Sequence, residues 1–272
     1  MNRLRLALAL ACASIVGCAG GSPLLHPART LDTGVVSAAG GVSANIAVGG
    51  VAEDLRNARE QAAKNVDVPG PAGTDTVYAK GALVAAAVAP GLAPFVAARV
   101  GAGNHYEGGI AYTGRGARID LRRSFDAGRV SFSAGAGVTG AFYGRTQGSQ
   151  LPNVELAALH GYGADVPLLV GWESDAGLYR AWAGVRAGFE HDDIDSLTSE
   201  PKNVTIGTPP IRLSATRLWG GGLVGIGTGF RHLHVAVELD VAYASTVGEY
   251  NETRVVVRGL SLCPATALWW TF

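Results

Sequence analysis

The sequence is poor in cysteine, in lysine and in long apolar runs. It contains only 3 Cys, too few for the disulfide framework of a small secreted protein. After residue 17 no stretch offers about 18 consecutive apolar residues, which argues against a transmembrane helix in the mature chain. The formal net charge is +0 at pH 7, so there is no electrostatic reason to expect nucleic acid as a partner.

The composition is nevertheless apolar. Hydrophobic residues make up 48% of the chain, charged residues 16%, and the mean hydropathy is +0.21. Lysine occurs only at Lys64, Lys80 and Lys202, so arginine supplies nearly all the positive charge. Arginine forms planar, multi-donor pairs, which suggests charges held in a confined place. The HExxH, GxSxG and P-loop motifs do not occur, and we predict no enzyme, no catalytic residue and no cofactor.

The first residues have the layout of a secretory signal. MNRLRLALALACASIVGC begins with two arginines, continues with an apolar run and ends in small residues. Its last four residues, IVGC, resemble the lipobox of bacterial lipoproteins, in which cleavage precedes a cysteine that is then diacylated. The resemblance implies a signal peptide at 1–17, lipidation at Cys18 and a lipid-anchored spacer at 18–33. An ordinary signal peptide cut nearby is the alternative.

Behind the signal, apolar and polar residues alternate with period 2, the pattern of a β-strand. The clearest stretch is RHLHVAVELDVAYA at 231–244, and 178–190 and 129–142 repeat the pattern. These strands reach or exceed the 9–11 residues that cross a bilayer when tilted. Strands are predicted at 34–48, 76–89, 92–103, 108–124, 129–142, 161–173, 178–190, 211–229, 231–245 and 253–272.

This pattern predicts an all-β fold, an up-and-down antiparallel transmembrane β-barrel of about ten strands over 34–272; eight or twelve strands remain possible. Segments 76–89 and 108–124 are the least regular, because Lys80 and Arg115 fit neither face. Short turns alternate with longer connections, as in outer-membrane barrels. The alternative is a soluble sandwich or lipocalin-like barrel with its apolar side inward, which the strand length and the buried charges disfavour.

The chain ends in LWWTF, with Leu268, Trp270 and Phe272 on one face. This ending resembles that of bacterial outer-membrane β-barrel proteins, whose last strand typically ends in an aromatic residue after alternating apolar positions. The resemblance implies that these three residues form an assembly signal read by the barrel-assembly machinery. It also implies a location in the outer membrane, with outer-membrane lipid around the barrel.

If the apolar faces meet lipid, the alternate positions line the lumen. About ten strands enclose a narrow interior, so bulky charged side chains should fill it and pair there. We therefore predict a structural or surface partner-binding protein with a largely filled lumen; the alternative is a narrow porin or small-solute channel. The predicted lumen charge network comprises Arg118, Asp120, Asp165, Arg180, Arg186, Glu190, Glu238 and Asp240.

A cluster of His191, Asp192, Asp193 and Asp195 follows the strand at 178–190. A histidine with carboxylates on the rim resembles the omptin proteases, ten-stranded barrels with acid–His pairs, but no second strand carries a matching motif and no omptin residue is transferred. A solvated acidic loop is the favoured interpretation. His232 and His234, two residues apart, could share a metal ion, but ordinary polar residues of the lumen or rim are the favoured interpretation. The DDID run lacks the glycine and the terminal glutamate of an EF-hand loop, and we predict no metal.

One segment breaks the β pattern. In 51–66 apolar residues recur at helical spacing, which predicts a short helix in the first external loop. We expect extracellular partners, where present, at the loops 49–75 and 191–210.

Overall fold

The chain folds into one closed barrel of ten antiparallel strands. The computed structural model describes residues 22–64, 76–142, 151, 159–194, 212–250 and 253–272. Each strand pairs with its neighbours in the chain, and β1 closes the ring by pairing with β10. The predicted fold class is confirmed. The strands are β1 (Val36–Val48), β2 (Gly91–Gly103), β3 (Tyr106–Tyr112), β4 (Gly116–Ala127), β5 (Val130–Ala141), β6 (Leu159–Glu173), β7 (Tyr179–Ile194), β8 (Leu213–Phe230), β9 (Leu233–Tyr250) and β10 (Thr253–Thr271).

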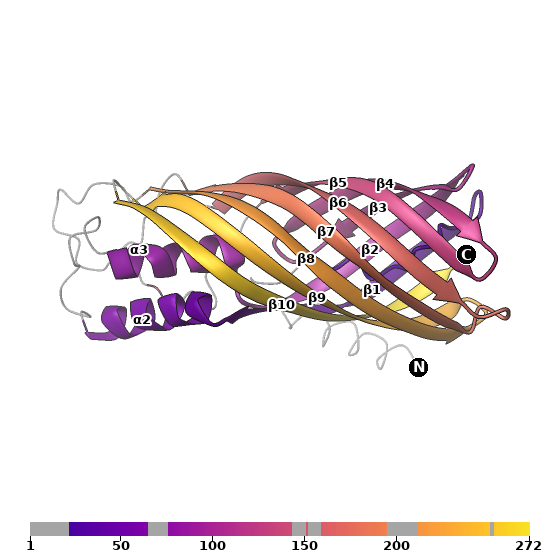
Figure 1. Ribbon diagram of the computed structural model, residues 1–272, viewed down its shortest axis with the longest axis horizontal. Helices are drawn as coiled ribbons and strands as arrows, with labels where there is room; N and C mark the ends of the chain where they lie inside the picture. The colour runs from indigo at the N-terminus through magenta and orange to yellow at the C-terminus, as the bar shows by residue number, and fades with distance from the viewer. Residues whose placement is uncertain (1–21, 65–75, 143–150, 152–158, 195–211, 251–252) are drawn as a thin grey trace, which may run out of the picture.

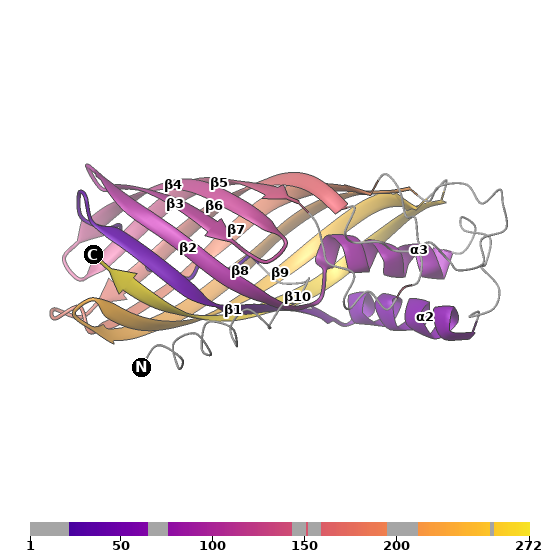
Figure 2. The same ribbon diagram turned by 180° about the vertical axis from the view of Figure 1, so that it is seen from behind.

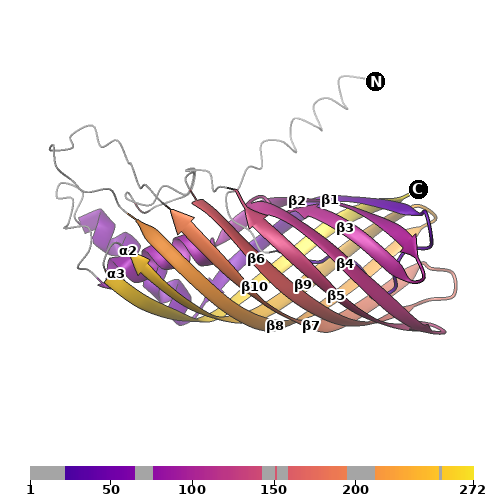
Figure 3. The same cartoon turned by 90° about the horizontal axis from the view of Figure 1, so that it is seen from above.

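The two ends of the barrel differ. At one end, the turn end, short turns join the strands and the C-terminus lies beside the start of β1 (Figure 1). Asn104 and His105, with φ of 50° and 62°, form one of these turns, which fits the two-residue hairpin types that match the sheet twist. At the other end, the helix end, α2 (Gly50–Lys64) and α3 (Thr76–Leu83) lie at the barrel mouth (Figure 2). Seen from above, the strands run obliquely to the long axis (Figure 3).

The apolar face of the strands points outward. On β9, Val237 is 50% and Leu239 40% exposed, whereas Glu238 between them is 1% exposed. The same alternation holds on β4, where Ile119 and Leu121 are exposed. The predicted orientation of the two faces is confirmed. An exterior of aliphatic side chains is stable in hydrocarbon and unfavourable in water.

Exposed aromatic residues border this apolar exterior at the turn end. All lie within three residues of the turn-end limit of their strands, as in the interfacial girdle of a membrane barrel. Arg123 lies over two of these rings, about 5 Å from each centroid. The girdle consists of Tyr106, Phe125, Phe132, Trp172, Tyr179, Phe230, Trp270 and Phe272.

The strand predicted at 76–89 is wrong. The segment forms α3, followed by the single π-helical turn η1 (Val84–Val88). Its sequence is rich in alanine, the best helix former, and its buried residues recur at helical rather than alternate spacing. The buried set includes Ala79, Ala82, Leu83, Ala86 and Ala87. The helix predicted at 51–66 is confirmed as α2.

The single strand predicted at 108–124 is also wrong. It is a hairpin of β3 and β4, because TGRG at 113–116 forms a turn in which Gly114 has φ of +78°. This extra strand replaces the one lost at 76–89, so the predicted count of ten was reached through two errors that cancel. β7 and β9 also continue beyond their predicted ends, to Ile194 and Tyr250.

The strands are of unequal length. β2 to β5 contain 7 to 13 residues, whereas β8, β9 and β10 contain 18 or 19. The long strands reach the helix end, where their inward residues are apolar and pack with α2, α3 and η1. Leu213, Tyr250, Val255 and Val257 belong to this cluster with Leu83 of α3. None of the helices in the described ranges combines the length and the hydropathy needed to cross a membrane.

Candidate functional site

The lumen holds a chain of seven alternating cations and carboxylates. Arg122 binds Glu107 with Nη2 2.8 Å from Oε1, and Glu107 also binds Arg99. The chain continues to Asp165, whose Oδ2 lies 2.8 Å from Arg118 Nε and 2.9 Å from Arg186 Nη2. Every carboxylate thus contacts two guanidinium groups, which offsets the cost of burying each charge. In order the chain is Arg122, Glu107, Arg99, Asp120, Arg118, Asp165 and Arg186.

The N-terminal residues 22–33 form a lumen segment that enters from the turn end. They belong to the predicted lipid-anchored spacer at 18–33, and this described part of it lies inside the barrel. Leu24, Leu25 and Ala28 are buried against inward residues such as Trp182 and Trp269. Apolar packing therefore holds the segment within an otherwise polar interior.

Both ends of the charge network bind the backbone of the lumen segment. Arg122 donates to the carbonyl oxygens of Pro27, Ala28 and Arg29, and Arg186 donates to that of Ser22. The network contains four guanidinium groups and three carboxylates. The surplus guanidinium donors are therefore satisfied by peptide carbonyls, as buried donors require.

Two carboxylates bind the amide groups of the same segment. Glu238 accepts hydrogen bonds from the backbone N–H of Leu24 at 2.6 Å and of Leu25 at 3.0 Å, and from Trp182 Nε1 at 2.7 Å. Glu107 accepts one from the N–H of Leu31 at 2.8 Å. Carboxylates that accept several N–H donors remain stable when buried. Because these bonds join specific residues of the segment to the barrel wall, they fix its position along the barrel axis.

The helix end is closed by a second set of bonds. The carbonyl oxygen of Ala87 in η1 accepts from Arg115 Nη1 and Arg217 Nη1, each at 3.0 Å, and that of Val88 accepts from Asn45. Cations at the C-terminal end of a helix also interact favourably with its dipole. The η1 turn is therefore held to the barrel wall by polar contacts on the turn-end side of the apolar cluster.

The described residues line two larger cavities inside the barrel. One, of about 280 Å³, lies at the turn end beside the lumen segment. The other, of about 80 Å³, lies between Ser22 of the lumen segment and Val88 of η1. His26 borders the first; its burial, and then the nearby Arg122 guanidinium, hold the pKa of this imidazole well below its usual range. His26 is therefore neutral at physiological pH.

The structure places all eight residues of the predicted lumen charge network in the interior. Arg118, Asp120, Asp165 and Arg186 belong to the seven-membered chain. Arg180 instead binds Glu173, with Nη2 3.0 Å from Oε1. The remaining three lie in other contacts: Glu190 binds Arg217 at 3.0 Å, Glu238 binds the lumen segment, and Asp240 lines the smaller cavity.

Sequence reasoning missed Glu107 and the role of Arg115. Glu107 was assigned to a connection, although it is fully buried and binds two arginines. Arg115, assigned to neither face, binds Asp192 at 2.6 Å. Recognition of the turn at 113–116 would have put Glu107 on the inward face of its strand and Arg115 in the turn itself.

The predicted assembly signal lies on the outside. Leu268, Trp270 and Phe272 are 55%, 46% and 70% exposed, and the N–H of Phe272 donates to the carbonyl oxygen of Val36. Cys18 lies outside the described residues.

The rim cluster is divided between the two faces of β7. His191 and Asp193 lie on the same face as Phe189, with His191 Nε2 3.0 Å from Asp193 Oδ2, while Asp192 is buried on the other face. Asp195 lies outside the described residues. His191 Nδ1 also lies 2.8 Å from Thr216 Oγ1, so both ring nitrogens are engaged.

The imidazoles of His232 and His234 bond different groups and do not form one site. His232 is exposed and bonds the carbonyl oxygen of Thr271, whereas His234 is buried and bonds that of Arg231. Within the described ranges no group of three or more His, Cys, Asp or Glu residues is arranged to hold a metal ion.

No protein-family model matches the chain, and no curated protein matches it. Among solved structures it is similar to Neisserial surface protein A, at 8% identity over 88% of this chain and 99% of that one, with a TM-score of 0.34. It is similar to the outer membrane protease OmpT of Escherichia coli, at 8% identity, 88% and 97% coverage and a TM-score of 0.35. A major outer membrane protein of Thermus thermophilus gives 17% identity, 58% and 92% coverage and a TM-score of 0.32.

Proposed function

We propose that the protein is a bacterial outer-membrane β-barrel whose lumen is closed at both ends and whose role is structural or partner-binding at the cell surface. The observation that carries the proposal is the combination of an apolar, aromatic-bordered exterior with an interior occupied by residues 22–33 and η1. Outer-membrane barrels have short periplasmic turns, so the turn end faces the periplasm and the helix end faces outward.

In the proposed orientation, the proposed partner sites face the outside of the cell. The loops 49–75 and 191–210 belong to the helix end, and α2 exposes Glu53, Arg56 and Glu60 there. Leu268, Trp270 and Phe272 lie on the outward face near the turn end, and the barrel-assembly machinery would bind them from the periplasmic side before lipid surrounds the barrel. Diacylated Cys18, in this proposal, adds a lipid anchor to the exported chain.

Conductance tests the closed lumen against the alternative of a small-solute channel. We expect the purified full-length protein, inserted into planar bilayers, to show no stable openings, because the charge network and the lumen segment leave only separate cavities. Heat-modifiable migration on SDS gels checks that the same purified protein is folded. Discrete openings of the unchanged protein would replace the proposal with the channel.

A further inference from the structure

The smaller cavity, of about 80 Å³, is lined by polar atoms that lack partners. Four buried atoms on its lining have no hydrogen-bond partner within the described part of the chain: Ser22 Oγ, Arg217 Nε, Trp219 Nε1 and Asp240 Oδ1. A buried polar atom left unpaired costs about 1–3 kcal/mol. Their concentration around one space indicates that the contents of the cavity supply the missing bonds.

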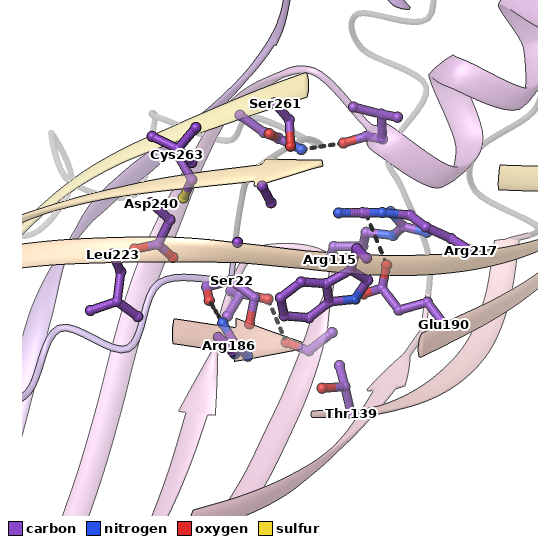
Figure 4. A pocket seen from close by; sticks show the side chains of 18 of the residues that line it. Ser22, Arg115, Thr139, Arg186, Glu190, Arg217, Leu223, Asp240, Ser261 and Cys263 are labelled. Carbon is purple, nitrogen blue, oxygen red and sulfur yellow. Dashed lines mark hydrogen bonds and ion pairs between the residues drawn. The ribbon is translucent and has the colours of Figure 1, made fainter. Parts of the chain in front are cut away.

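The unpaired atoms differ in kind from one side of the cavity to the other. Figure 4 shows Asp240, Leu223 and Cys263 on one side, and Arg217 with Glu190 on the other. Asp240 offers a carboxylate oxygen, which requires a donor. Arg217 Nε and Trp219 Nε1 carry only hydrogens, which require an acceptor. A molecule that satisfies the cavity therefore has a donor at one end and an acceptor at the other.

Charge pairing assigns the donor end a positive charge. Two of the three arginines on the lining have a carboxylate each, Arg115 with Asp192 and Arg217 with Glu190, whereas Arg186 shares Asp165 with Arg118. Asp240 forms no salt bridge with any of the residues that the structure describes, and it is hydrogen-bonded to a second carboxyl group, that of Glu238. The one surplus positive charge of the seven-membered network therefore balances one of these two carboxyl groups and leaves the other without a cation. An ionised carboxylate in an enclosed site is stable only with a cation or strong donors, and an ammonium group meets both needs.

The volume limits the size of the molecule. One water occupies about 10–15 Å³ on the same measure, so the cavity of about 80 Å³ accommodates about five to eight non-hydrogen atoms. The side chains of Leu223 and Cys263 lie near Asp240 and offer apolar contact to a short alkyl chain.

We propose that the lumen binds a small ammonium compound with an oxygen acceptor at its far end, the ammonium group at Asp240 and the oxygen at Arg217 Nε and Trp219 Nε1. This site is independent of any partner at the cell surface. It is also compatible with a closed lumen, because the molecule is held between Ser22 and Val88 and does not cross the barrel.

Three probes of about equal size separate the two requirements: 3-amino-1-propanol carries both groups, butylamine lacks the oxygen and 1,3-propanediol lacks the ammonium. Saturation-transfer NMR on the full-length barrel should give 3-amino-1-propanol a Kd on the order of 1 mM or below, a weak affinity suited to so few atoms. Either single-function probe should bind at least about ten-fold more weakly, since each leaves a buried group unpaired.

Two substitutions locate the site. Asp240→Asn should weaken 3-amino-1-propanol at least about ten-fold and Trp219→Phe less, while Asp175→Asn in an exposed turn and Trp172→Phe on the exterior should leave its Kd unchanged. Equal affinity for all three probes would show that the protein recognises neither the ammonium group nor the oxygen, and no saturable binding by the unchanged protein would mean that the cavity holds water only. Either result would overturn the proposal. Because the probe comparison uses the unchanged protein, it stands even where a variant fails to fold.

Discussion

Asp165 is one of the three carboxylates that hold the charge network together. Its two oxygens bind both Arg118 and Arg186, and all three side chains are between 3% and 6% exposed. Removal of one partner from a buried ion pair leaves the other charge uncompensated. In this network a single carboxylate compensates two guanidinium groups.

We therefore expect Asp165→Asn to lower the free energy of unfolding by about 3–5 kcal/mol, the usual cost of breaking a buried pair. The same change at Asp175, whose side chain is 70% exposed beside Arg129, should cost at most about 1 kcal/mol. Urea unfolding of both variants in lipid vesicles measures the difference. Similar small losses at the two positions would show that the network does not stabilise the barrel.

Among the elements, the α2–α3 hairpin is fitted most closely at Gly81. A Cβ atom built on Gly81 would lie 2.1 Å from the Cβ of Ala58 on α2 and 3.1 Å from the carbonyl oxygen of Asp54. No side chain fits between the two helices at this point. The hairpin therefore depends on one small residue.

Gly81→Val should separate α2 from α3, because overpacking against a neighbouring helix typically costs about 1–3 kcal/mol. Hydrogen–deuterium exchange should increase in 50–64 and 76–88 while the strands stay protected. Gly50→Ala is the control, since a Cβ there meets nothing within 4 Å. Unchanged exchange in Gly81→Val would contradict the close packing of the two helices.

Most of the strands, but not the helical and lumen segments, could be predicted from the sequence. The alternation of apolar and polar residues identified eight of the strands. Each of them has an apolar outward face and a polar inward face, and this difference is visible in the sequence without knowledge of the tertiary structure. The alanine-rich 76–88 has no such contrast, so its periodicity was misread. The lumen segment left no signal in the sequence: Leu24 bonds to Glu238, 214 residues away, and a contact of that range is set by closure of the barrel.

At the scale of the whole molecule, the exterior defines where hydrocarbon should lie. Val237 and Val256 are both outward and similarly exposed, at 50% and 43%. Val237 lies among aliphatic residues on β9, whereas Val256 on β10 lies between Arg254 and Arg258, which are also exposed. The apolar band therefore ends below Val256, towards the turn end.

Arginine placed at these two sites should destabilise the barrel to very different extents. Val237→Arg should destabilise the barrel by about 2–4 kcal/mol, the cost at the bilayer midplane, and Val256→Arg by about 0–1 kcal/mol. Folding equilibria in phospholipid vesicles, followed by the temperature at which migration on SDS gels changes, measure both. Equal stability of the two variants would contradict the claim that hydrocarbon surrounds Val237.

The unequal strand lengths make two sides of the barrel differ in height at the helix end. At about 3.3 Å per residue, the 19 residues of β10 run about 60 Å, whereas the 7 residues of β3 run about 23 Å. Among the described strands, β8 to β10 extend alongside the helical hairpin, whereas β2 to β5 are much shorter. In the proposed orientation, a large molecule would pass the short strands more readily than the long ones on its way to the hairpin, so the rotational setting of the barrel in the bilayer would influence which neighbours reach it.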